Sequence, residues 1–217
     1  MNGMNTTAAH HPIFDDCKAR AGMGFRYAIE TTWATDGWLY ATDSRICVRA
    51  KTDEADTIGK FPPTTKLFID KWRDTPLKLP VMVEPKVTKC DDCGGTGFFS
   101  TCPRCEGTGS VECSEGHDHD CGACNGSGKD KSGKPIQCDS CEDGKIYEWP
   151  VFDFGVVALG GKYVSIMLKH GCRVFAWDGK NAANKPVRFE FDGGEGLLMP
   201  VNLAENRSDG AIVEVPQ

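Results

Sequence analysis

The stretch CDDCGGTG at residues 90–97 recurs as CPRCEGTG at 102–109, CGACNGSG at 121–128 and CDSCEDGK at 138–145. Each copy begins with Cys-x-x-Cys, which places two sulfur atoms on one side of a tight turn where they can share a metal ion. Zn²⁺ takes four ligands in tetrahedral geometry, so the four pairs predict two closed four-cysteine sites. A closed site leaves no position for a catalytic water, which indicates structural zinc.

The distribution of the cysteines supports metal binding. The chain has 12 cysteines, and all but Cys17, Cys47 and Cys172 lie between Cys90 and Cys141. That segment is poor in large aliphatic residues, so it needs a source of stability other than a hydrophobic core. Redox pairs or disulfides are the alternative use of Cys-x-x-Cys, but in a reducing compartment paired thiols favour metal.

The start of the chain lacks the layout of a signal peptide, and no apolar run is long enough to span a bilayer. We therefore expect a cytoplasmic protein, in a bacterial or phage-infected cell, with no membrane partner. The net charge of −6 argues against nucleic-acid binding by bulk positive charge.

The pattern Cys-x-x-Cys-x-Gly-x-Gly resembles the repeat of the cysteine-rich zinc domain of DnaJ-type co-chaperones, over residues 90–144. The resemblance implies that the first and fourth repeats share one ion and that the second and third share another. It thus implies two zinc ions per chain, held by Cys90, Cys93, Cys138 and Cys141 and by Cys102, Cys105, Cys121 and Cys124. The fourth repeat departs from the pattern, because Asp143 and Lys145 replace its glycines.

The segment CSEGHDHD, between the second and third repeats, contains Cys113, His117 and His119. These side chains could form a third, mixed Cys/His site. The alternative, which we favour, is a solvated hairpin tip with a free thiol.

The segments before and after the cysteine repeats, called the flanks, are predicted to form strands and short helices. Before the repeats, an antiparallel meander is predicted over 25–50 with a turn at residues 35–37, a short helix over 61–72 and a strand over 77–85. After them, an amphipathic helix is predicted over 162–170, and strands over 172–177, 187–191 and 196–203. The simplest arrangement is one α+β domain, rich in antiparallel sheet, formed by residues 1–88 and 146–217 around a zinc module at 89–145. Two separate flanking domains are the alternative.

Four flanking segments also resemble, in order, parts of a domain of the bacterial DNA sliding clamp, the β subunit of the replicative polymerase. They are WLYATDSRICVRA at 38–50, FPP at 61–63, VVALGGKYVSIML at 156–168 and GLLMPVNL at 196–203. The resemblance implies helices packed on antiparallel sheets, with DNA-facing basic residues on the helices. The corresponding residues here are Lys66, Lys71, Arg73, Lys162 and Lys169. A ring needs several such domains, so copies would assemble as a homo-oligomer, or the fold is retained without the ring. An unrelated α+β domain with similar turns is the alternative.

No catalytic constellation stands out, so we expect a protein that is not an enzyme. The leading hypothesis is a zinc-binding accessory factor in DNA replication, with a clamp-like body that reaches DNA through its assembly. The second is a co-chaperone-like or regulatory module whose zinc hairpins grip a protein partner. The third, nucleic-acid binding by the hairpins, is disfavoured because acidic residues outnumber Lys and Arg there.

Overall fold

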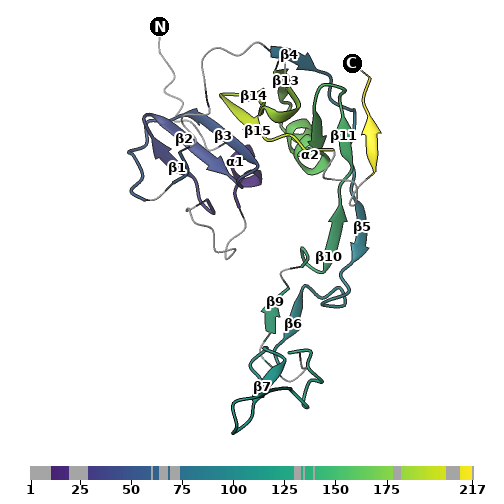
Figure 1. Ribbon diagram of the computed structural model, residues 1–217. Helices are drawn as coiled ribbons and strands as arrows, with labels where there is room; N and C mark the ends of the chain where they lie inside the picture. Colours follow the sequence, from purple (N-terminus) through teal and green to yellow (C-terminus); the bar gives the residue numbers. More distant parts are fainter. Residues whose placement is uncertain are drawn as a thin grey trace. The chain divides into compact units, whose positions relative to one another are not determined.

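The chain divides into two compact units in the computed structural model (Figure 1). The structure describes residues 11–19, 29–59, 61–63, 68, 74–129, 133, 135–138, 140–177, 182–203 and 211–216. The body comprises Met1–Glu84 with Trp149–Gln217, and the hairpin unit comprises Pro85–Glu148. The hairpin unit extends beyond the predicted module at both ends, because β5 (Lys86–Lys89) pairs with β10 (Lys145–Glu148).

The body is built on a seven-stranded antiparallel sheet with the order β1-β2-β3-β15-β14-β13-β4. The strands are β1 (Trp33–Thr35), β2 (Trp38–Thr42), β3 (Ile46–Lys51), β4 (Asp74–Leu77), β13 (Arg173–Trp177), β14 (Val187–Phe191) and β15 (Gly194–Leu198). Because β3 pairs with β15, segments from before and after the hairpin unit lie side by side in one sheet (Figure 1).

A smaller sheet and short helices complete the body. β11 (Val151–Asp153) lies between β12 (Ala158–Gly160) and β16 (Ile212–Glu214), and its pairing with β16 is parallel. The helices among the described residues are α1 (Ile13–Asp16), α2 (Gly161–Lys169) and the 3₁₀ turn η2 (Ala182–Asn184). The fold is therefore rich in antiparallel sheet, with a small helical part. No helix in the described ranges is both long and apolar enough to cross a membrane.

The main core lies against one face of the large sheet. The strands alternate, so Leu39, Ala41 and Val48 point to this face while Tyr40 and Cys47 point to the other. The helices contribute side chains such as Phe14 and Met167 to the same core. Burial of these apolar residues, each stabilising by about 1.5–3 kcal/mol, holds the layers together.

Several predicted elements are present with shifted ends. The meander is β1-β2-β3, whose first strand begins at Trp33, and the part of the prediction over 25–28 lies outside the described residues. Residues 35–37 form the predicted turn, with positive φ at Asp36 and Gly37. α2 occupies the predicted helix and ends before Gly171, whose φ is +62°. The three predicted C-terminal strands correspond to β13, β14 and β15.

Residues 61–85 are predicted to contain a short helix and a strand. The strand predicted over 77–85 is wrong, because β4 ends at Leu77 and residues 78–85 form no strand. Pro80 and Pro85 lack the N–H that a sheet ladder needs, and Val81 is fully exposed. The helix predicted over 61–72 lies outside the described residues, apart from 61–63 and 68.

The hairpin unit contains three two-stranded antiparallel ribbons. Besides β5–β10, they are β6 (Phe98–Ser100) with β9 (Pro135–Gln137) and β7 (Ser110–Glu112) with β8 (Asp118–Asp120). The four cysteine repeats connect these ribbons, and the buried side chains among the described residues of the unit are those of the Cys-x-x-Cys pairs.

Candidate metal centres

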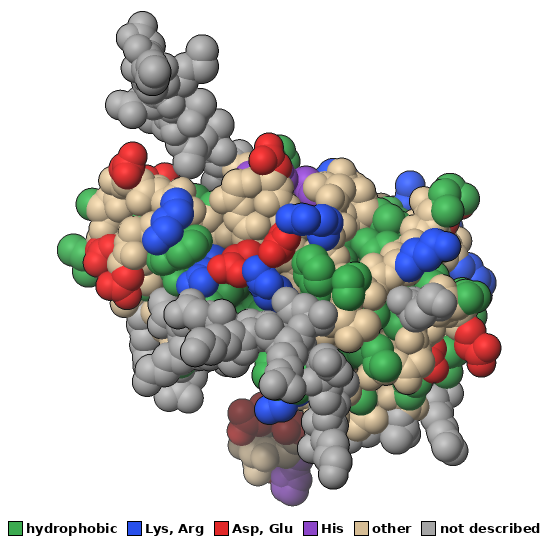
Figure 2. Space-filling model, turned by 90° about the horizontal axis from the view of Figure 1, so that it is seen from above, with side chains coloured by type: hydrophobic (Ala, Val, Ile, Leu, Met, Phe, Trp, Pro, Cys, Tyr) green, Lys and Arg blue, Asp and Glu red, His purple; other side chains and the backbone are tan. Residues whose placement is uncertain are grey.

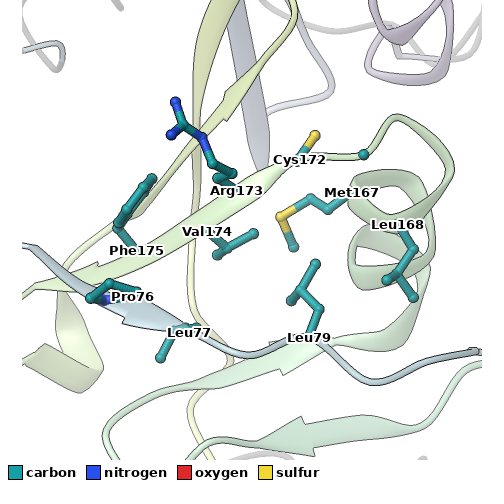
Figure 3. A pocket seen from close by; sticks show the side chains of 10 residues that line it. Pro76, Leu77, Leu79, Met167, Leu168, Cys172, Arg173, Val174 and Phe175 are labelled. Atoms are coloured by element: carbon teal, nitrogen blue, oxygen red, sulfur yellow. The ribbon is translucent and has the colours of Figure 1, made fainter.

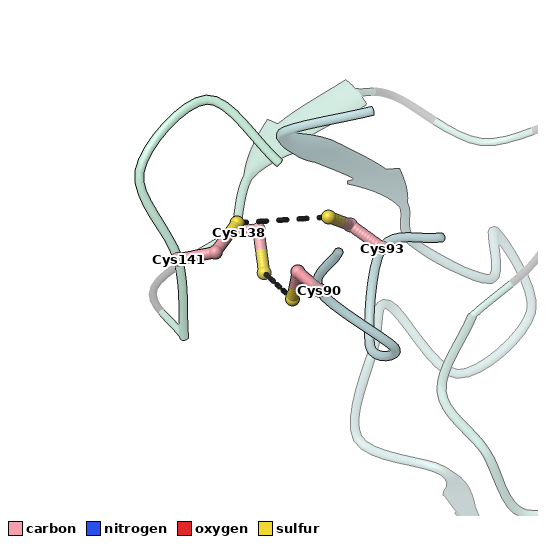
Figure 4. A group of neighbouring side chains, drawn as sticks. All are labelled: Cys90, Cys93, Cys138 and Cys141. Carbon is pink, nitrogen blue, oxygen red and sulfur yellow. Dashed lines mark hydrogen bonds between the residues drawn. The ribbon is translucent and has the colours of Figure 1, made fainter. Parts of the chain in front are cut away.

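The eight predicted ligands form two four-sulfur clusters. The outer centre consists of Cys90, Cys93, Cys138 and Cys141, and the inner centre of Cys102, Cys105, Cys121 and Cys124. Within each centre all sulfur atoms lie within 4.8 Å of one another. The structure thus brings together the sets that the repeat resemblance implies. Figure 4 shows the outer centre, with the side chains of both Cys-x-x-Cys pairs directed toward one another.

The sulfur separations match a shared metal ion. In the outer centre they are 3.9 Å for Cys90–Cys138 and 3.6 Å for Cys93–Cys141. The matching pairs of the inner centre are 3.9 and 3.7 Å apart. Four sulfurs placed tetrahedrally at about 2.3 Å from Zn²⁺ are about 3.8 Å apart, whereas a disulfide needs about 2.05 Å. None of the described cysteines forms a disulfide, so each centre could hold one metal ion.

Reciprocal backbone hydrogen bonds pair the repeats. In the outer centre, the N–H of Cys90 donates to the carbonyl of Gly144 at 2.9 Å, and the N–H of Cys138 donates to Gly97 at 2.8 Å. In the inner centre, Cys102 donates to Gly128 and Cys121 to Gly109, both at 2.8 Å. The first cysteine of each repeat is therefore bonded to the last glycine of its partner repeat.

The same bonds show how the fourth repeat departs from the pattern. Gly97, Gly109 and Gly128 each stand four residues after the second cysteine of their repeat, whereas Gly144 stands three after Cys141. Gly144 nevertheless accepts the equivalent hydrogen bond, with φ of +83° after +49° at Asp143. The loop of the fourth repeat is one residue shorter and still closes the centre.

Backbone N–H groups stabilise the ionised form of one cysteine in each centre. Burial by itself would raise the pKa of Cys93, but the N–H of Gly97, 3.3 Å from its sulfur, and the neighbouring thiols lower it to about 6. The pKa of Cys105 is likewise lowered to about 6, against burial, by the N–H groups of Gly109 and Gly107. The thiolate is the form that binds metal, so these two residues are ionised near neutral pH.

Cys124 and Cys141, which lie across the two centres from these thiolates, stay protonated when no metal ion is bound. Burial, together with the adjacent sulfur atoms, raises the pKa of Cys124 to about 11 and that of Cys141 to about 12. A bound cation inverts this balance, because a coordinating thiol is deprotonated outright. Metal binding is therefore expected to release protons.

The hairpin tip does not add a third centre. Among the described residues, the groups suited to hold a metal are the two four-cysteine sets, and Cys113, His117 and His119 belong to neither. The N–H of Cys113 donates to the carbonyl of His117 at 2.9 Å, which closes the tip, and His119 is exposed on β8. This matches the favoured interpretation of a solvated tip.

Of the candidate DNA contacts, two are described and both face carboxylates. Lys169 Nζ lies 2.7 Å from Asp16 Oδ2, and Lys162 Nζ lies 4.0 Å from Asp43 Oδ2. Lys66, Lys71 and Arg73 lie outside the described residues. On the face drawn in Figure 2, basic and acidic side chains are interleaved.

The structure also reveals polar contacts that join residues far apart in the sequence. Asp16 Oδ2 lies 2.7 Å from His170 Nε2, so the carboxylate of the last residue of α1 meets the end of α2. The Tyr163 hydroxyl donates to Asp43 Oδ2 at 2.9 Å, while Asp43 Oδ1 accepts the N–H groups of Arg45 and Ile46. Asp43 thus closes the turn between β2 and β3, and no local signal in the sequence indicates its bond to Tyr163.

An apolar groove of about 510 Å³ opens in the body beside β4, the end of α2 and β13. Figure 3 shows Leu79, Met167 and Val174 converging on it. Its thiol, Cys172, has a pKa raised by burial to about 12 and is therefore protonated and unreactive. The groove offers apolar contact rather than reactive groups.

No model of a known protein family matches the chain, and no curated protein matches it either.

Proposed function

We propose that this protein is a non-enzymatic zinc protein in which two structural Zn²⁺ ions shape the hairpin unit, and that this unit presents a binding surface to another protein. The observation that carries the proposal is the pair of closed four-sulfur centres. With four protein ligands the ion has no open position, so it supplies folding free energy rather than chemistry.

The surface of the hairpin unit fits a protein partner better than a nucleic acid. Val87 and Tyr147 face each other across β5–β10 and are 50% and 36% exposed, and Phe98 is 54% exposed. Acidic residues outnumber basic ones in the unit, and each Zn²⁺ with four thiolates adds a net charge of about −2. Phosphate backbones require the opposite sign.

Metal content is the first test. Native mass spectrometry and elemental analysis of the reduced, purified chain should give two zinc ions. One ion, or none, would contradict the paired centres.

The binding role is tested with an aggregating, unfolded client protein. The zinc-loaded chain should suppress aggregation, and Val87→Ser with Tyr147→Ser should remove that effect while leaving two zinc ions bound. A variant that keeps full suppression would place the binding surface elsewhere.

The second candidate function is that of an accessory factor in DNA replication with a clamp-like body. It is supported by the order of the resembling segments and by the pairing of two of them, since β3 lies beside β15. Solution mass and DNA titrations over a range of salt concentrations would test it. A ring-sized assembly with salt-sensitive binding is expected, and a monomer without affinity at low salt would eliminate this role.

A further inference from the structure

The two centres close chain segments of very different length. The first cysteines of the paired repeats are 19 positions apart in the inner centre and 48 apart in the outer one. The segment between the inner repeats is the local hairpin β7–β8, whereas the segment between the outer repeats contains the whole inner centre. The inner centre can therefore assemble from a short stretch of chain.

Loop-closure entropy favours the inner centre as the first to form. The free-energy cost grows with the logarithm of loop length and the closure probability falls with about its three-halves power, so spans of 19 and 48 residues differ about fourfold in closure probability. Closing the inner span first also shortens the open part of the outer one, which raises the probability of closing it about twofold.

Lys129 provides a physical link from the inner repeats to the outer centre. It directly follows Gly128, whose carbonyl accepts the N–H of Cys102. Lys129 Nζ donates to the carbonyl of Asp92, within the first repeat, and lies 4.8 Å from the centroid of the Phe99 ring. Phe99 packs against the four outer cysteines. Assembly of the inner centre therefore places the Lys129 cation against Phe99, beside the outer centre.

We propose that metal loading is ordered: the inner centre binds first, and its formation raises the affinity of the outer centre through the shortened loop and Lys129. This inference rests on the proposed function, since it assumes two zinc ions per chain. The coupling is reciprocal, as thermodynamic linkage requires.

The test compares stepwise zinc affinities, measured by competition with a chelator, in the full chain and in two variants. Cys93→Ser with Cys141→Ser disables the outer centre and should leave one ion bound with the affinity of the native first step. Cys105→Ser with Cys124→Ser disables the inner centre, and its remaining ion should bind about fivefold to tenfold more weakly than in the native second step. Unchanged affinity in this second variant would overturn the proposal.

A variant that keeps all eight cysteines guards against misfolding of the serine variants. Lys129→Ala should weaken the second step about twofold to fivefold and leave the first step unchanged. Lys86→Ala is the control, because Lys86 pairs with Glu148 in the same unit and should alter neither step. Equal loss in both lysine variants would overturn the role of Lys129, whereas a native chain that binds fewer than two ions would instead reject the proposed function.

Discussion

At the scale of single residues, the hairpin unit depends on glycines where two backbones meet. A Cβ added to Gly109 would lie 2.3 Å from the carbonyl oxygen of Gly126, and one added to Gly128 would lie 2.3 Å from that of Gly107. These glycines also have positive φ, which L-residues rarely adopt. The cysteines hold the ion, and the glycines let the partner repeats approach closely enough to share it.

Gly109→Ala is therefore expected to weaken metal binding at the inner centre by at least tenfold, because backbone atoms cannot move aside cheaply. Gly116→Ala is the matched control, since Gly116 has the same φ of +81° but its nearest atom is a side-chain oxygen 3.7 Å away. The control should cost only the left-handed strain of about 1–2 kcal/mol. Chelator competition on both variants measures the difference, and equal effects would contradict the close-approach argument.

Asp16 makes a pH-dependent contribution to the body. Burial alone would raise its pKa, but hydrogen bonds from Lys169 and His170 outweigh it and lower the pKa below the ordinary 3.8. A carboxyl group whose pKa is lowered by folding stabilises the fold at pH values above its pKa in the unfolded chain. This stabilisation is lost as the pH falls through its pKa in the folded chain. Asp16→Asn should therefore cost about 0.5–1 kcal/mol at pH 7 and almost nothing near pH 2.

Urea unfolding at both pH values measures this difference. Asp15→Asn, at an exposed position that faces Lys18 at 2.7 Å, is the control and should show a smaller change. A cost for Asp16→Asn that stays constant down to pH 2 would argue against the ion pair.

At the scale of elements, the large sheet carries a row of charges on the face opposite its main core. Arg49, Glu195, Glu190 and Arg173 stand directly opposite one another across β3, β15, β14 and β13. Arg188 bridges the two glutamates, with contacts of 2.7 Å to Glu190 and 3.2 Å to Glu195. Ion pairs between alternating positive and negative side chains thus link the four neighbouring strands on this face.

Glu195→Gln tests this row, because Glu195 accepts hydrogen bonds from Arg49 at 2.6 and 3.0 Å and Arg49 is only 12% exposed. Removing the charge should lower the free energy of unfolding by about 1–3 kcal/mol. Arg173→Gln is the comparison, since Arg173 is 76% exposed at the end of the row and should cost under about 1 kcal/mol. If both variants lost a similar free energy of unfolding, burial would not determine how much each ion pair of the row contributes.

The elements also show what sequence reasoning can reach. The ligand cysteines, β14 and α2 were predictable because local spacing and periodicity determine them. β16 and its parallel pairing with β11 were missed, because a three-residue exposed strand has no pattern of its own. The strand predicted over 77–85 is wrong, because its apolar residues resemble a strand while Pro80 and Pro85 interrupt the ladder. Bonds such as Arg49–Glu195 join residues 146 positions apart and left no local signal.

At the scale of the whole molecule, the two units draw their stability from different sources. The body has an apolar core, whereas the buried side chains described in the hairpin unit are those of its Cys-x-x-Cys pairs. Metal should therefore matter greatly to one unit and little to the other, since structural zinc sites contribute folding energy directly.

Chelation of the reduced protein should consequently unfold the hairpin unit alone. The five tryptophans all lie outside Pro85–Glu148, so their fluorescence reports on the body and should change little. Limited proteolysis should begin at lysines of the hairpin unit, such as Lys129, and re-adding zinc should restore resistance. Loss of the tryptophan signal together with the metal would show that the body also depends on it.

The outermost ribbon of the hairpin unit gives the chain a property useful to protein engineering. Lys86 and Glu148 are direct partners in β5–β10, so the chain leaves this unit beside the point at which it entered. Because its two ends adjoin, we expect this segment to act as a cassette that is transferable to the turn of another β-hairpin without stretching the strands of the host. The host may be exchanged while the cassette keeps its two ions, and the cassette may be swapped for a two-residue turn while the host keeps its sheet.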